Sequence, residues 1–234
     1  MKRLLSTMYW DAQLQFRNGF YYVTLFVIVL WTVLVSQLPL SDLGWLLPAL
    51  VVGNLLINTF YFTGGLMLLE KGEGTLEAQV VTPLRPWEYL ASKIATLALL
   101  AMVENLVIVS LLYGLRFAAL PLVLGIVLAA AMYCLAGFIV VARYDSINEY
   151  LFPSMAYTFV LSLPLLPYFG LGQSEWFYLH PLQAPLVLVR AAFQPADAWQ
   201  LVYGLGYSAV WIGLLYHLSR RIFLRFIVAK EGVR

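Results

Sequence analysis

The chain has 234 residues, of which 62% are hydrophobic and 11% are charged, and its formal net charge is +2. Soluble domains are about half apolar and about a quarter charged, so this composition, with a mean hydropathy of +0.84, excludes an ordinary soluble domain and indicates an integral membrane protein. The charged, mixed start of the chain does not fit a secretory signal peptide, and the single Cys134 excludes a disulfide within the chain. We expect one membrane domain over residues 1–234.

Residues 2–18 have the pattern of an amphipathic helix. Its apolar face contains Leu4, Leu5, Met8, Tyr9, Ala12 and Phe16, and its polar face contains Lys2, Arg3, Ser6, Gln13 and Arg17. A charged face with low net hydrophobicity is typical of a helix that lies in the lipid headgroup region. We therefore predict an interfacial helix over residues 1–19, which Asn18-Gly19 ends. The alternative is that these residues form the first turns of the next helix.

Six long apolar stretches follow, each close to the about 20 residues that cross the hydrocarbon core of a bilayer. They are residues 20–38, 45–69, 94–113, 120–142, 151–169 and 201–218. The second carries Asn54 and Asn58 one helical turn apart, and Gly64-Gly65 offers a kink near its end. Three prolines interrupt the fifth.

Residues 170–200 are too apolar for an ordinary loop, and Pro181, Pro185 and Pro195 divide them too often for a span. The piece 183–193 is long enough for about three helical turns, and short apolar pieces of this kind are often re-entrant or interfacial. The predicted fold class is therefore an all-α integral membrane protein. It has six transmembrane helices, the interfacial helix at the N-terminus and a re-entrant outer segment before the last span.

Lys and Arg accumulate on the cytoplasmic side of membrane proteins. The N-terminus, residues 70–93, residues 143–150 and the C-terminal tail carry three, three, one and five of them, which makes twelve, whereas only Arg116 and Arg190 fall on the other side. This distribution predicts a multi-pass protein with both termini and both polar loops in the cytoplasm.

The polar stretch 70–93 carries four acids and three bases, seven of the 26 charged residues (14 basic and 12 acidic). We expect it to lie in water between the second and third spans. Thr75 can cap a short helix that runs to Val81 and that the following Thr-Pro pair ends, after which Trp87 and Tyr89 return to the headgroup level. The alternative is a solvated loop. Because a long ordered loop usually has a function, we predict a docking surface for a soluble partner.

The sequence contains no GxxxxGK[ST] phosphate-binding loop and no GxSxG, HExxH or CxxC motif. We therefore expect no ATP hydrolysis by that route, no catalytic residue and no metal site on this chain. We also expect the lipid bilayer, and no nucleic acid, among its partners.

Glu104 is the single acid inside a predicted span. An ionisable residue in hydrocarbon is costly and indicates a functional site by default. Glu104 is a candidate to bind a cationic or zwitterionic substrate or to carry a proton, and the alternative is a hydrogen-bonded residue that holds helices together. Together with Asn54, Asn58 and Asn105 it is our candidate for the polar lining of a substrate path.

Two segments resemble a known family. The stretch EKGEGTLEAQVVTPLRPWEYLASK is similar to the first cytoplasmic loop of ABC-2-type permeases, the membrane subunits of ATP-binding-cassette (ABC) exporters, and RYDSINEYLFPS extends the likeness to the second loop. The fluoroquinolone-export permease group is the most similar. The resemblance implies a coupling helix over residues 73–81 that docks into a nucleotide-binding ATPase subunit, and a smaller second contact over residues 143–149.

The resemblance also implies a set of coupling residues and partners. The coupling residues are Glu70, Glu73, Gly74, Thr75, Leu76, Glu77, Arg143, Asp145 and Glu149. A second permease chain, identical or related, would complete a dimer around the path. ATP and Mg would be bound by the ATPase subunit, with no cofactor on this chain, in the cytoplasmic (inner) membrane of a bacterium.

The sequence therefore predicts a permease subunit, not an enzyme by itself, that exports a small molecule, drug or lipid-like substrate with ATP hydrolysed by a separate subunit. Two alternatives stay open. One is a proton-coupled carrier that uses Glu104, and the other is a membrane anchor whose loop recruits a soluble partner. The identity of the cargo is not encoded in any motif that we recognise.

Overall fold

The computed structural model describes residues 2–39, 43–76, 85–172 and 174–228. These residues form helices, with no strand among them, which confirms the predicted all-α fold. The helices are α1 (Lys2–Arg17), α2 (Phe20–Ser36), α3 (Leu47–Leu55), the π-helix η1 (Leu56–Tyr61), α4 (Phe62–Gly72), α6 (Pro86–Tyr113), α7 (Ala119–Val141), α8 (Ile147–Ser162), α9 (Leu165–Tyr168), the 3₁₀ helix η2 (Glu175–Leu179), α10 (Gln183–Arg190), α11 (Ala198–Ile222) and the π-helix η3 (Phe223–Val228).

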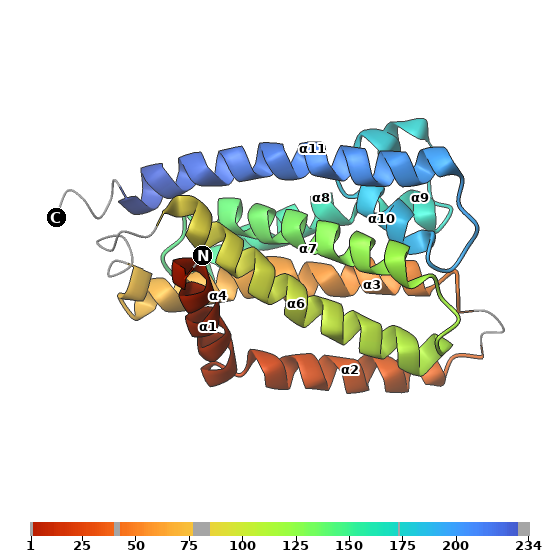
Figure 1. Cartoon of the computed structure of the whole chain (residues 1–234), viewed down its shortest axis with the longest axis horizontal. Coiled ribbons are helices and arrows are strands. Elements are labelled where there is room, and N and C mark those ends of the chain that lie inside the picture. Colours follow the sequence, from red (N-terminus) through yellow and green to blue (C-terminus); the bar gives the residue numbers. More distant parts are fainter. Residues whose placement is uncertain (1, 40–42, 77–84, 173, 229–234) are drawn as a thin grey trace.

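The helices form an elongated bundle around α7 (Figure 1). Helix α7 is apolar on every side, as expected for a helix with no solvent-exposed face, and it packs against α4, η1, α6, α10 and α11. Small residues allow this close packing. A Cβ atom on Gly137 would lie 2.7 Å from the Phe60 carbonyl oxygen, and one on Gly125 would lie 2.7 Å from Val189. Helix α7 is therefore the centre of the core.

The described part of the chain contains four helices that are long and apolar enough to cross a membrane: Leu47–Gly72, Pro86–Tyr113, Ala119–Val141 and Ala198–Arg225. The bent pair α1–α2 makes a fifth candidate. The predicted fifth span is divided instead, because 16-residue α8 ends at Ser162 and Pro164 caps the one-turn α9. The structure therefore supports four or five of the six predicted spans, and a crossing by α8 stays a prediction.

The predicted break after the first helix is confirmed. Helices α1 and α2 meet at 64°, and Gly19 supplies the positive φ of 80° that the turn requires. Helix α1 packs against α6 with its polar Asp11 and Gln15 buried, whereas Leu5 and Phe16 are exposed. The predicted polar residues Arg3, Ser6, Gln13 and Arg17 are exposed as well, so α1 contacts the protein through Asp11 and Gln15, which the prediction did not place on either face.

The polar stretch between the second and third spans is shorter than predicted. Helix α6 begins at Pro86, not at residue 94, because proline suits the first helical position and the Glu88 side chain accepts a hydrogen bond from the Arg85 backbone N–H at 2.8 Å. Tyr89 is therefore buried and does not lie at the headgroup level as expected.

The second span is irregular at a different place from the one predicted. It continues as α-helix through Gly64-Gly65, and the irregularity is η1, which contains Asn58. Gly64 instead allows close packing, because a Cβ atom there would lie 2.6 Å from the Tyr150 hydroxyl.

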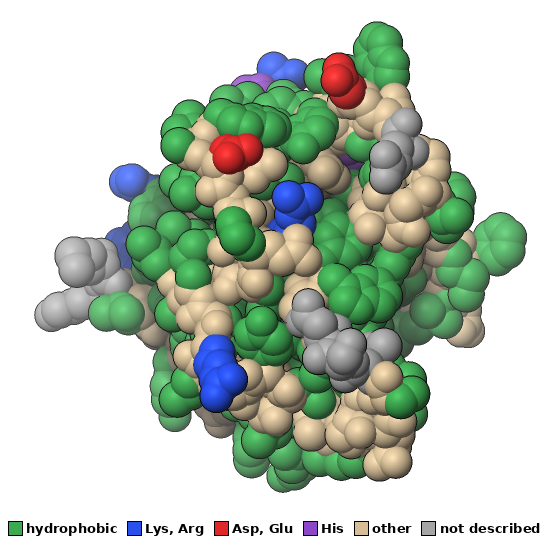
Figure 2. Space-filling model, turned by 90° about the vertical axis from the view of Figure 1, so that its right-hand side faces the viewer, with side chains coloured by type: hydrophobic (Ala, Val, Ile, Leu, Met, Phe, Trp, Pro, Cys, Tyr) green, Lys and Arg blue, Asp and Glu red, His purple; other side chains and the backbone are tan. Residues whose placement is uncertain are grey.

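Residues 170–200 contain short helices, as the prolines predict. Helix α10 is almost entirely buried and packs against α3, α7 and α11. It lies at the end of the bundle where the α6–α7 connection also lies, opposite α1 (Figure 1). That end carries few charged side chains (Figure 2).

Candidate functional site

Five buried polar side chains join α1, α4 and α6 where the loop predicted to dock a partner leaves the membrane. We call them the loop-root cluster: Asp11, Glu70, Tyr89, Ser92 and Lys93. Lys93 Nζ forms ion pairs with both Asp11 and Glu70. The Ser92 hydroxyl donates to Asp11, and the Tyr89 hydroxyl donates to Glu70 at 2.7 Å. Buried charges are stable only when they are paired and hydrogen-bonded in this way.

Further contacts fix the first turn of the loop to this cluster. The Arg17 guanidinium at the end of α1 lies 2.6 and 2.7 Å from the two Glu73 carboxylate oxygens. The Thr75 hydroxyl donates to the Glu70 carbonyl oxygen at 3.2 Å, and Leu76 is buried. The loop therefore leaves the bundle from a fixed position.

Lys71 connects the base of this loop to the second polar loop. Its Nζ donates to the Ala142 and Tyr144 carbonyl oxygens at 3.1 and 2.6 Å, and it lies 3.4 Å from Asp145. Downstream, the Ser146 side chain caps α8 by accepting from the Glu149 backbone N–H. One lysine thus holds the two loops together.

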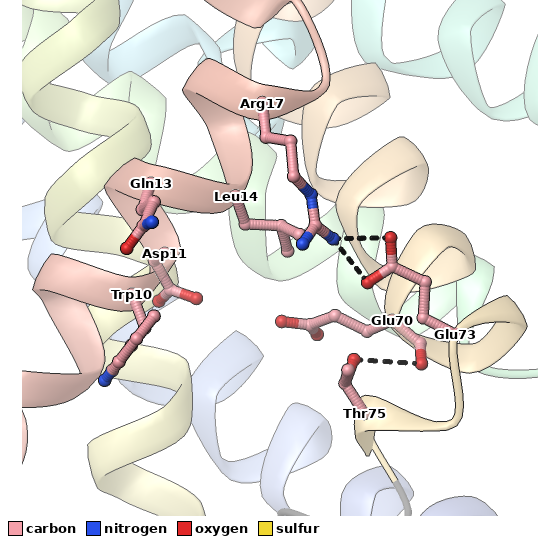
Figure 3. A pocket seen from close by; sticks show the side chains of 8 residues that line it. All are labelled: Trp10, Asp11, Gln13, Leu14, Arg17, Glu70, Glu73 and Thr75. Atoms are coloured by element: carbon pink, nitrogen blue, oxygen red, sulfur yellow. Dashed lines mark hydrogen bonds and ion pairs between the residues drawn. The ribbon is translucent and has the colours of Figure 1, made fainter.

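A cavity of about 330 Å³ opens between α1 and the end of α4. Its lining residues are Trp10, Asp11, Gln13, Leu14, Arg17, Glu70, Glu73 and Thr75 (Figure 3). The Asp11 and Glu70 carboxylates point toward its centre, and the Arg17–Glu73 ion pair lies at one side (Figure 3). The cavity separates the interfacial helix from the base of the loop.

A second buried polar cluster lies within the spans, and it contains the four residues predicted for the substrate path. The Asn54 side-chain N–H donates to Glu104 at 3.0 Å and to the Asn105 side-chain oxygen at 3.2 Å. Asn58 donates to the other Glu104 oxygen. All four side chains are buried. We call them the intramembrane cluster.

The structure distributes the predicted coupling residues among different environments. Glu73, Arg143, Asp145 and Glu149 are exposed, whereas Glu70 and Leu76 are buried and Gly74 and Thr75 are half-buried. Glu77 and most of the predicted coupling helix lie outside the described residues. Glu70 therefore cannot offer a surface to a partner, and it acts on the loop from inside the bundle.

The sequence analysis missed the α1 side of the loop-root cluster. Asp11 and Gln15 are four residues apart on α1, and their partners Ser92 and Thr96 are four residues apart on α6. This matched spacing, with polar groups on an otherwise apolar α6, is the signal that could have predicted the contact. It also missed Thr24 on α2, which lies beside Glu104.

His180 fixes the segment that precedes α10. Its Nδ1 accepts from the Leu182 backbone N–H at 3.2 Å, and its Nε2 lies 3.1 Å from the Val160 carbonyl oxygen on α8. Nδ1 must be unprotonated to accept, so the ring is neutral with its proton on Nε2. Burial favours this neutral form and lowers the pKa of His180.

Comparison with known proteins agrees with this architecture. The sequence model of the Fluoroquinolones export permease protein family matches residues 2–231. The chain is 33% identical over 236 residues to fluoroquinolones export permease proteins of two Mycobacterium tuberculosis strains, CDC 1551 / Oshkosh and ATCC 25618 / H37Rv, with 100% of each chain covered. This protein is therefore a membrane-embedded transporter permease, and it belongs to the fluoroquinolones export permease family.

Proposed function

We propose that the chain is the membrane-spanning subunit of an ABC-2-type exporter, driven by ATP that a separate nucleotide-binding subunit hydrolyses. The permease would dimerise with a second copy or a related chain in the inner membrane of a bacterium, with both termini in the cytoplasm. Its cargo would be a small drug-like molecule of the fluoroquinolone class, since the relatives in Mycobacterium tuberculosis carry that name.

The observation that carries this proposal is the fixed base of the docking loop. A coupling loop must transmit movement, so its base should be held rigidly to the spans. Here Lys93 holds α1 and α4 to α6, and Lys71 holds the second loop to the first. Residues 73–81 would form the main contact with the ATPase subunit, and Arg143, Asp145 and Glu149 the second.

A proton-coupled carrier is the second candidate. It is favoured by Glu104, a buried acid whose hydrogen-bond partners are amides. This alternative predicts transport by the purified chain alone, driven by a pH gradient.

The test is a pull-down of the tagged chain from native membranes, followed by an ATPase assay of the eluate. We expect a Walker-motif protein to co-elute, with ATP turnover that Glu77→Lys reduces. Glu175→Lys is the matched control, because Glu175 is an exposed acid at the opposite end of the bundle. Elution of the chain without a nucleotide-binding protein, together with transport driven by pH alone, would instead support the carrier. A co-eluting protein with no ATP-dependent transport would support the membrane anchor.

A further inference from the structure

The Glu104 carboxylate has no positive counter-charge on the helices packed around it. The described helices α2, α3, η1 and α7 contain no Asp, Glu, Lys, Arg or His at all. On α6 itself, the nearest basic side chain in sequence is Lys93, and that base is already paired with Asp11 and Glu70. An unpaired charge within a span is costly, and in membrane proteins such acids commonly lie on the path of a substrate or ion.

In the described part of the chain, each of the two asparagine amides beside Glu104 forms hydrogen bonds through its nitrogen but not through its oxygen. Asn54 and Asn58 each direct their side-chain nitrogen to the carboxylate. Within the described residues, the side-chain oxygens of Asn54 and Asn58 are buried and have no hydrogen-bond partner. Buried acceptors without a partner are rare and need an explanation.

One type of ligand supplies the missing charge and can use the amide oxygens once they turn toward Glu104. A protonated amine supplies the missing positive charge and several N–H donors, and it accepts nothing. When a carboxamide turns by 180° about its last bond, its nitrogen and oxygen exchange places. The Asn54 and Asn58 oxygens would then face a cation at Glu104. The N–H groups of the cation would meet three acceptor groups, the carboxylate and the two amide oxygens.

The backbone at this point is irregular. Asn58 lies in the π-helix η1, which begins directly after the α3 residue Leu55, and short π-helical segments inside α-helices occur frequently at functional sites. The site is closed in this conformation, because Glu104 has no exposed surface. A ligand would enter when α3 and α6 separate.

We propose that Glu104, Asn54 and Asn58 bind the protonated amine of the cargo, so that the permease selects molecules with a cationic nitrogen. This inference rests on the proposed function and specifies its substrate class. It assigns the charge recognition to Glu104 and the acceptor groups to the two asparagines.

The test uses the full-length permease alone in lipid nanodiscs, with pairs of compounds in which one member has a basic nitrogen and the other carries an acetyl group on that nitrogen. The first pair is norfloxacin and N-acetylnorfloxacin, and the second is 1-aminoadamantane and its N-acetyl amide, because acetylation removes the basic nitrogen. We expect the wild-type chain to bind each amine about tenfold or more tightly than its amide, the effect of a charge-assisted hydrogen bond. Glu104→Gln should abolish this preference, and Glu104→Asp should keep part of it.

A matched control is Glu175→Gln, which removes an exposed acid far from the site and should leave the preference unchanged. Equal binding of amines and amides by the wild-type chain, or no binding of either, would overturn the inference. Since no ATPase subunit is present in this experiment, its outcome is independent of the pull-down that tests the proposed function.

Discussion

Lys93 is the residue on which the loop-root cluster depends. It pairs with two buried acids, Asp11 and Glu70, so its removal leaves buried carboxylates without a partner. We expect Lys93→Met to lower the free energy of unfolding by about 3–5 kcal/mol. The measurement is reversible unfolding in detergent micelles, monitored by circular dichroism.

The control for this prediction is Arg17→Met, which breaks the exposed ion pair with Glu73 and should cost less than about 1 kcal/mol. Adding Asp11→Asn and Glu70→Gln to Lys93→Met should restore part of the loss. Equal effects of Lys93→Met and Arg17→Met would contradict the role of the buried cluster.

The hydrogen bonds of His180, which fix the segment before α10, should make the stability of the fold depend on pH. Because the pKa of His180 is lowered in the folded chain, the unfolded chain binds more protons, and stability rises with pH in this range. The stabilisation that neutral His180 provides is complete above the unfolded pKa of about 6.5. It is lost as the pH falls through the lower pKa of the folded chain. We expect the unfolding temperature of the wild type to fall between about pH 7 and pH 5, and His180→Gln to reduce that slope. An unchanged slope in the variant would show that other groups cause it.

At the scale of elements, the contact between α7 and η1 should tolerate no extra atom. A Cβ on Gly137 would lie 2.7 Å from the Phe60 carbonyl oxygen, so one helix must shift. We expect Gly137→Ala to destabilise the protein by about 1–3 kcal/mol, measured as a lower unfolding temperature. Gly213→Ala on α11 is the comparison, since a Cβ there meets nothing within 4 Å and alanine favours a helix. If both variants lose stability equally, close packing at Gly137 is not the cause.

The elements differ in how well the sequence predicted them. The length of the apolar stretches predicted the long helices, and Asn18-Gly19 predicted the break between α1 and α2. Both signals are local in the sequence. The return of the chain toward the third span near Trp87 and Tyr89 was predicted, but the span itself was placed from residue 94, because the charges of the 70–93 stretch were interpreted as exposed. Lys93 is buried with Asp11, a partner 82 residues away, and only the matched four-residue spacing of polar groups on α1 and α6 points to that pairing.

The candidate sites show the same distinction. The intramembrane cluster was predicted because Asn54, Asn58, Glu104 and Asn105 are polar residues inside apolar stretches, and such residues come together in a bundle. The loop-root cluster was not predicted as a cluster, because its members were assigned to water. The π-helix η1, which packs against α7, has no signal in composition.

At the scale of the whole molecule, Lys71 should determine how the two polar loops act together. It joins the end of α4 to the carbonyl groups that precede α8. We expect Lys71→Met to leave the amount of co-purified ATPase subunit within about twofold but to lower permease-stimulated ATP turnover about tenfold, the effect of losing charged hydrogen bonds. Turnover equal to that of the wild type would show that the loops act independently.

The buried Asp11 of α1 has a consequence for the order of synthesis. Asp11 is made early, but its partner Lys93 is made 82 residues later, after the first two apolar helices have been synthesised. Until then α1 has nowhere to place a carboxylate except the aqueous edge of the bilayer. Its docking on α6 is therefore a late step, and it reports that the first three long helices have been inserted in the correct arrangement.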